Sequence, residues 1–260
     1  MKLTDSHCHL ADPQLMPELP EILDKARAAG VWRFLIPASS PADWQAVAAL
    51  ADKTQMPSEQ AIFHIALGIH PWFSDGVCEA DFHTLTQMLE KHPDAWVGEI
   101  GLDFQVGNPN PAQRRHQRDI FVRQLEYAES LGRRVVIHNL KATAAVADAL
   151  KAARFTQGGI AHAFSGSLEE ARILLRCGLK IGIGSLLLNP NAKKVRAVLR
   201  DLDDSDFVLE TDSPFMLKNA VNTPANLKQI AQTAAEIRGT TPETLAAQTE
   251  RNIESLLCQA

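Results

Sequence analysis

The chain has 260 residues, of which 45% are hydrophobic and 22% are charged, a balance that is typical of a folded protein with a large core. The formal net charge of −5 argues against a protein that holds nucleic acid over a broad basic surface. The sequence has no basic segment followed by an apolar run at its start, and no stretch of ~20 uninterrupted apolar residues. We therefore expect a cytoplasmic location, no membrane partner and no obligate protein partner.

Apolar runs of strand length alternate with segments of helical periodicity along the whole chain. The expected strands cover residues 3–6, 32–37, 63–69, 96–101, 134–138, 159–163, 179–184 and 207–211. The expected helices cover residues 19–29, 41–53, 81–91, 111–131, 141–154, 168–177, 192–202 and 225–238. Strands that alternate with helices are parallel, and this number of units in a chain of this length predicts an α/β fold, a single (β/α)8 TIM barrel.

The C-terminal segment 241–257 has helical periodicity and opens with Thr241-Pro242-Glu243. We expect an additional C-terminal helix there, packed outside the barrel. A doubly wound open sheet is the structural alternative, but it needs a glycine-rich turn after the first strand, and residues 7–12 read His-Cys-His-Leu-Ala-Asp. We find no linker and no repeat, so residues 1–260 are expected to form one domain.

Two histidines one residue apart, His7 and His9, follow the first expected strand. Alternate side chains of an extended segment point to the same face, so both imidazoles can point toward one metal ion. A TIM barrel carries its catalytic groups at the carboxyl ends of its strands, and further polar residues occur at the ends of other expected strands. These are His70, Glu99, His138, His162 and Asp212.

Carboxylates and imidazoles that converge on a barrel mouth are costly to bury without a cation. Donor sets of imidazole and carboxylate without thiolate suit zinc, manganese and similar ions better than calcium. We therefore expect two divalent metal ions, with Zn, Mn and Mg as the candidates. Asp103 and Glu210 flank the site motifs, and we expect them to orient ligands.

The chemistry of these side chains suggests which metal ion each of them binds. His7 and His9 are expected to bind one metal, and His138 and His162 the second. Glu99, with two carboxylate oxygens, can bridge the two ions. Asp212 is the expected remaining ligand and the general base for a metal-bound water, so Asp212 and Glu99 are the predicted catalytic residues.

Motifs along the chain carry a family resemblance. They are His-Cys-His at 7–9, Leu-Gly-Ile-His-Pro at 67–71, Gly-Glu-Ile-Gly-Leu-Asp at 98–103, Val-Ile-His at 136–138, His-Ala-Phe-Ser-Gly-Ser at 162–167 and Leu-Glu-Thr-Asp-Ser-Pro at 209–214. In order and spacing they resemble the TatD-type metal-dependent deoxyribonucleases, which belong with the amidohydrolase-like barrels. The resemblance implies a divalent-metal hydrolase that acts on DNA from the 3′ end. It also implies metal binding by His7, His9, Glu99, His138, His162 and Asp212.

The chain departs from this family pattern where phosphate would be held. Many members have Ser-Arg after the histidine of the fifth strand, whereas Asn139-Leu140-Lys141 follow His138 here, so Lys141 is the basic group predicted to contact substrate. Many members also have a longer loop with an arginine after the last aspartate, whereas this chain has the short segment 215–224. His70 and Trp72 are the other predicted substrate contacts. Trp72 is placed either to stack on a nucleobase or to cover a core edge.

The pattern as a whole predicts a hydrolase of phosphodiester bonds, a 3′–5′ deoxyribonuclease with DNA or another phosphodiester as substrate. The same two-metal site also suits a carboxylic ester, a cyclic amide or an aminoacyl-tRNA ester, and this alternative stays open. A metal-bound scaffold without turnover is a third hypothesis. Asp212 argues against it, because a purely structural site needs no base beside an open coordination position.

Overall fold

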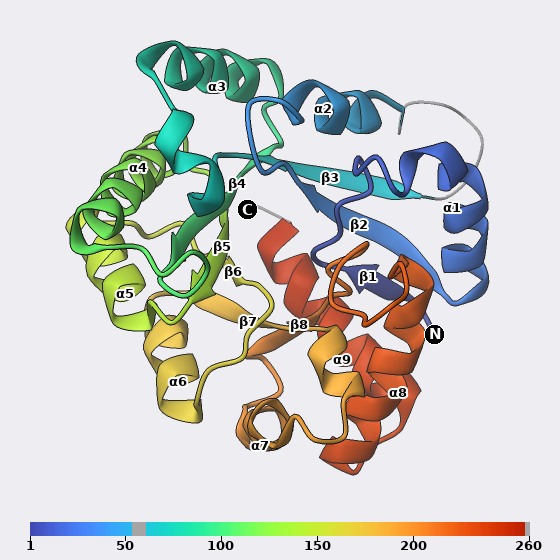
Figure 1. Cartoon of the computed structure of the whole chain (residues 1–260). Helices are drawn as coiled ribbons and strands as arrows, with labels where there is room; N and C mark the ends of the chain where they lie inside the picture. Colours follow the sequence, from blue (N-terminus) through green and yellow to red (C-terminus); the bar gives the residue numbers. More distant parts are fainter. Residues whose placement is uncertain (54–60, 258–260) are drawn as a thin grey trace.

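A computed structural model describes residues 1–53 and 61–257. Within these residues, eight parallel strands form one sheet in which each strand pairs with the next along the chain (Figure 1). The strands are β1 (Leu3–Asp5), β2 (Val31–Pro37), β3 (Ile62–Leu67), β4 (Trp96–Asp103), β5 (Val135–Leu140), β6 (Gly159–Ala161), β7 (Leu179–Ile183) and β8 (Phe207–Leu209).

Backbone hydrogen bonds join the last strand to the first. The Ser6 amide donates to the Leu209 carbonyl at 3.0 Å, and the Asp212 amide donates to the His7 carbonyl at 2.9 Å. These bonds bring the carboxyl ends of β8 and β1 together. The structure therefore confirms the expected (β/α)8 TIM barrel.

Helices surround the strands as an outer ring (Figure 1). They are α1 (Leu19–Ala28), α2 (Trp44–Lys53), α3 (Glu79–Lys91), α4 (Pro111–Ser130), α5 (Thr143–Ala152), α6 (Leu168–Arg176), α7 (Lys193–Asp201) and α8 (Leu227–Arg238). Short 3-10 turns lie at Met16–Glu18, Pro71–Gly76, Ser185–Leu188 and Pro224–Asn226.

Local capping explains where several helices begin. The Ser167 side chain accepts from the Glu170 amide while the Glu170 side chain accepts from the Ser167 amide, so α6 begins directly after Ser167. Helix α3 begins two residues before the expected start at 81, because the Asp81 carboxylate accepts from the Cys78 amide. Helix α5 begins at Thr143 rather than at 141, since Lys141 has a φ of 57° and cannot belong to a right-handed helix.

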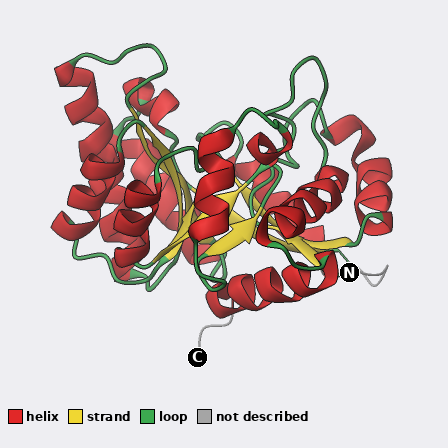
Figure 2. Cartoon of the chain, turned by 90° about the horizontal axis from the view of Figure 1, so that it is seen from below, coloured by secondary structure: helices red, strands yellow, loops and turns green. Residues whose placement is uncertain are grey.

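The additional C-terminal helix, α9 (Pro242–Leu257), is present and lies outside the barrel, as expected. Figure 2 shows it lying across one end of the barrel. Its Ile253 and Leu256 side chains pack with lumen residues from several strands, including Leu35, Val136 and Ile160. Helix α9 therefore closes the amino-terminal end of the barrel, because these apolar side chains would otherwise face water there. No helix within the described residues is long and apolar enough to cross a membrane.

Candidate metal centre

The predicted ligands gather at the carboxyl ends of the strands. The strand register pairs Gly101 with His138 and Ile137 with Ala161, so the donors of β4, β5 and β6 emerge next to one another. On the other side, the buried Asp5 carboxylate accepts from the Thr211 amide at 2.9 Å and from the Thr211 hydroxyl at 2.6 Å. This contact fixes the end of β1 against the end of β8. As a result, His7 and Asp212 lie in one cluster.

One half of the cluster surrounds the Oε2 atom of Glu99. This oxygen lies 3.3 Å from Nε2 of His7 and 3.6 Å from Nε2 of His9. The Oδ1 atom of Asp212 lies 3.6 Å and 3.5 Å from the same two nitrogen atoms, which are 3.1 Å apart. Four ligand atoms around a tetrahedral zinc ion are about 3.3 Å apart, given metal–ligand distances of about 2.0–2.1 Å. The donor spacing therefore fits a divalent cation.

The other half surrounds the Oε1 atom of the same carboxylate. Nε2 of His162 lies 2.6 Å from this oxygen, Nδ1 of His138 3.0 Å and Nε2 of His70 3.2 Å. The His138 and His162 nitrogen atoms are 3.3 Å apart. Each oxygen of Glu99 thus faces a separate set of donors, which is the arrangement that a bridging carboxylate needs.

Three overlapping groups bring their ligand atoms within 4.8 Å of one another, and all are built from this cluster: His7–Glu99–His162, His7–His9–Asp212 and His70–Glu99–His138. The six predicted ligands are brought together. His70 was expected to contact substrate, yet its Nε2 atom lies in the same donor cluster and its side chain is buried. In the sequence, no second residue near His70 marks it as a metal ligand. The pattern alone therefore could not place its side chain in the donor cluster.

Burial and neighbouring charges set the protonation of the cluster. Burial, followed by the charge of His162, lowers the pKa of His7 to about 4. Burial alone would raise the pKa of Glu99, but the surrounding histidines, His162 foremost, hold it well below its usual range. Burial is likewise outweighed at Asp212, whose pKa is lowered by its hydrogen bond with His9. Neutral imidazole and anionic carboxylates are the forms that bind metal ions.

Asp103 lies behind His138 and is fully buried. Its Oδ2 atom is 3.2 Å from Nε2 of His138 and accepts from Nε1 of Trp72 at 2.7 Å. Its Oδ1 atom accepts from the amides of Gln105 and Val106, each at 2.8 Å. Burial would lower the pKa of His138, but its hydrogen bonds to Asp103 and Glu99 raise it to about 9. Asp103 thus orients a predicted metal ligand, as the sequence suggested.

Glu210 faces into the barrel near the donor cluster and is fully buried. Its Oε1 atom accepts from the Ala163 amide, whereas Oε2 has no hydrogen-bond partner among the described residues. A Cβ atom at Gly182 would lie 2.3 Å from this oxygen, so a glycine is needed there. Burial raises the pKa of Glu210 well above its usual range.

A cavity of about 500 Å³ opens above the cluster. Its apolar walls include Trp72, Phe73, Phe215 and Met216. Of the residues predicted to contact substrate, His70 and Trp72 line this cavity, whereas Lys141 is exposed in the turn after β5 and is not among its lining residues. Phe215 carries no sequence signal that relates it to the site; only its position beside His9, with ring centroids 5.5 Å apart, does so.

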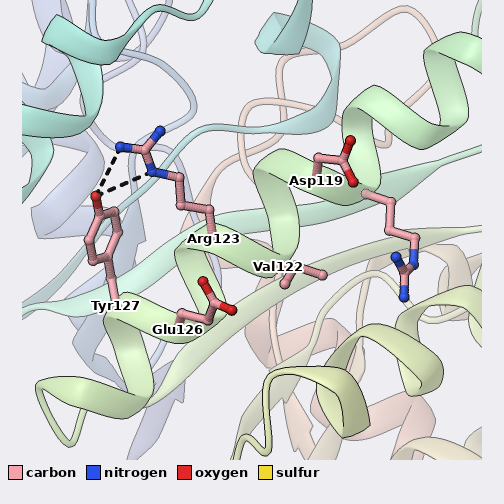
Figure 3. Close-up of a pocket in the computed structure, with 6 residues that line it drawn as sticks. Asp119, Val122, Arg123, Glu126 and Tyr127 are labelled. Atoms are coloured by element: carbon pink, nitrogen blue, oxygen red, sulfur yellow. Dashed lines mark hydrogen bonds between the residues drawn. The ribbon is translucent and has the colours of Figure 1, made fainter.

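A second, smaller hollow of about 360 Å³ lies on the outer face of α4 (Figure 3). Figure 3 shows the Arg123 guanidinium hydrogen-bonded to the Tyr127 hydroxyl. Arg123 also pairs with Glu79 at 2.6 Å. Because this arginine is already paired and no metal-ligand cluster lies among the lining residues, the hollow adds nothing to the chemistry at the barrel mouth.

Comparison with known proteins places the whole chain in one family. The family model described as TatD related DNase matches residues 4–258. The metal-dependent hydrolase YjjV of Escherichia coli K12 is 31% identical over 243 residues, covering 91% of this chain and 90% of that protein. Its crystal structure superposes with a TM-score of 0.89 at 29% identity, covering 98% of this chain and 97% of the other. The human deoxyribonuclease TATDN3 is 26% identical over 261 residues, covering 96% of this chain and 92% of that protein.

The match to the family model extends over almost every described residue, and the donor cluster lies within it. The relative YjjV is named as a metal-dependent hydrolase, and the barrel superposes on its crystal structure. The chain therefore belongs to the TatD-related DNase family of metal-dependent hydrolases.

Proposed function

We propose that this protein is a deoxyribonuclease that removes nucleotides from DNA 3′ ends by hydrolysing phosphodiester bonds. The observation that carries the proposal is the two-sided placement of donors around Glu99, whose Oε2 and Oε1 atoms each face separate imidazole nitrogens. Phosphoryl transfer benefits from two cations on either side of the reacting phosphorus. The human relative named as a deoxyribonuclease supports the choice of DNA.

We assign metal binding to the six predicted ligands, namely His7, His9, Glu99, His138, His162 and Asp212, which would hold two ions of Zn, Mn or Mg, with Glu99 as their common ligand. When bound, such ions neutralise phosphate charge and lower the pKa of water. Asp212 is the group proposed to accept the proton of the attacking water, because its carboxylate lines the cavity beside the other donors. His70 and Trp72 border the space for the substrate, and Lys141 supplies a cation beyond the cavity wall.

The first test is digestion of single-stranded oligonucleotides labelled at the 3′ or the 5′ end. Metal-free protein is resupplied with Mg²⁺, Mn²⁺ or Zn²⁺, and Asp212→Asn is assayed in parallel. Asp24→Asn, on the exposed surface of α1, is the matched control. We expect stepwise loss from the 3′ end that requires both metal and Asp212. Loss from the 5′ end, or internal cleavage alone, would overturn the exonuclease assignment.

An acyl substrate is the second candidate, and one observation favours it. Among the described residues that line the cavity there is no lysine or arginine, although such residues commonly hold phosphates. A carboxylic ester, a cyclic amide or an aminoacyl-tRNA ester could be hydrolysed by the same groups. Model esters and lactams are therefore assayed beside the oligonucleotides, and turnover of acyl substrates alone would select this candidate. A scaffold without turnover would fail with both substrate classes while still binding metal.

The remaining parts of the proposal concern the chain as a whole. We propose that residues 1–260 act as one hydrolase domain and that the protein works in the cytoplasm. The ordinary composition supports the first statement, since 45% hydrophobic residues suffice for one large core. Subcellular fractionation of the native protein tests the compartment, and elemental analysis of protein purified without added metal identifies the ion.

A further inference from the structure

Apart from the histidines of the donor cluster, the charged side chains that line the cavity in the described part of the chain are all acidic. They are Asp12, Asp43, Glu99 and Asp212. A protein that tracks a nucleic-acid backbone normally does so with lysine and arginine, whose contacts release counterions. Bound cations at the donor cluster can offset the charge of the phosphate at the reaction centre, but nothing on the cavity wall offsets the charge of further phosphates.

The cavity has exposed apolar side chains where lysine or arginine would be expected. These apolar side chains lie on two sides of the cavity. On one side, Trp72 is 57% exposed and Phe73 is 47% exposed. On the other side, Phe215 is 45% exposed and Met216 is 43% exposed. Large apolar groups gathered at a cavity commonly mark a binding surface. Both pairs lie beside the donors, since Trp72 is 4.8 Å from His70 and Phe215 is 5.5 Å from His9, measured between ring centroids.

A hydrogen bond holds the Trp72 ring in place, and backbone hydrogen bonds fix the main chain at Trp72 and Phe215. The Trp72 indole donates to Asp103 at 2.7 Å, and its amide donates to Nδ1 of His70 at 3.1 Å. The Phe215 amide donates to the Asp212 carbonyl at 2.8 Å. Since the contact with Asp103 orders the Trp72 ring before any ligand arrives, little entropy is lost when a planar group stacks on it. The cavity volume of about 500 Å³ is in the range of sites that enclose one small ligand.

We infer that the cavity recognises the unpaired nucleosides on either side of the scissile phosphate by their base faces, and not the polyanionic backbone. One base stacks on the wall of Trp72 and Phe73, and the other on the wall of Phe215 and Met216. The inference rests on the proposed phosphodiester activity and narrows its substrate to short, single-stranded ends. A dinucleotide then contains nearly all of the binding determinants.

The experiment compares the dinucleotide TpT with a T20 oligonucleotide, using protein saturated with Mn²⁺ at 50 and 200 mM NaCl. We expect the KM values per 3′ end to agree within about threefold for both substrates and both salt concentrations, since about one effective phosphate contact corresponds to that change. Four backbone contacts would instead raise the KM of T20 roughly 50-fold over this range. A steep dependence on salt or length, with cleavage intact, would overturn the inference alone.

Matched variants test the two walls separately. Trp72→Ala and Phe215→Ala should each raise the KM for TpT on the order of 10-fold, as expected for a lost base–aromatic stack, with unchanged metal content. Trp72→Phe should restore most of the binding. Val221→Ala is the control, because Val221 is 51% exposed after β8 but does not line the cavity. Unchanged KM values in both alanine variants would overturn the inference, and failure to cleave any phosphodiester would overturn the proposed function together with it.

Discussion

Replacement of Asp103 by asparagine should weaken one metal site without changing the shape of the core. Because the Asp103 carboxylate can only accept hydrogen bonds, Nε2 of His138 donates to it, and Nδ1 is the nitrogen atom that would lose its proton to bind a metal ion. An asparagine oxygen would remain with the amides of Gln105 and Val106, which each donate at 2.8 Å. Its NH2 group would then face His138 and favour the opposite tautomer.

The expected magnitude follows from the number of contacts that change. Asp103→Asn keeps two backbone hydrogen bonds and loses two, the one with His138 and the one from Trp72. Loss of the group that orients a metal-binding histidine typically costs about 10- to 100-fold in metal affinity. We expect this loss at the side of the cluster that contains His138, and no loss at the side that contains His7 and His9.

Competition with a chelator of known affinity, followed by calorimetry for stoichiometry, measures the two sites in one titration. Trp72→Phe is the matched control, because it removes only the indole donor at 2.7 Å and leaves the contact between Asp103 and His138. Its metal affinities should equal those of the parent protein. Two sites of parental affinity in Asp103→Asn would refute the argument that Asp103 sets the tautomer of His138.

Further predictions concern the metal ligands and the stability of the barrel. His138→Ala should lower the metal content from two ions toward one without unfolding the barrel, as measured by elemental analysis. Ile253→Ala, at a residue that is 1% exposed beneath the barrel, should lower the free energy of unfolding in urea by about 2–5 kcal/mol and spare metal binding. Burial raises the pKa of Glu250, so its ionised form costs stability at high pH. Glu250→Gln should therefore raise the Tm at pH 8, with a gain that shrinks toward pH 4.

The sequence predicted the position of a side chain correctly where that position follows from the alternation along a strand and from the parallel order of the strands. Glu99, His138 and His162 follow apolar runs, and parallel pairing of β4, β5 and β6 is enough to predict their proximity. The position of α9 could not be predicted in this way, because an amphipathic helix fits either the outer ring or the open end of the barrel. Only the contacts of Ile253 and Leu256 with lumen residues distinguish the two positions.

The loops explain why the chemistry was easier to predict than the substrate. Trp72 and Phe215 follow different strands, and no periodicity relates residues that are so distant in sequence. Their placement depends on single tertiary contacts, such as the hydrogen bond from Trp72 to Asp103. Asp103 also contacts His138, so one buried carboxylate orients both a predicted metal ligand and a wall of the cavity. A change of substrate therefore requires changes in the loops after β3 and β8, whereas a change at Asp103 affects metal binding and substrate binding together.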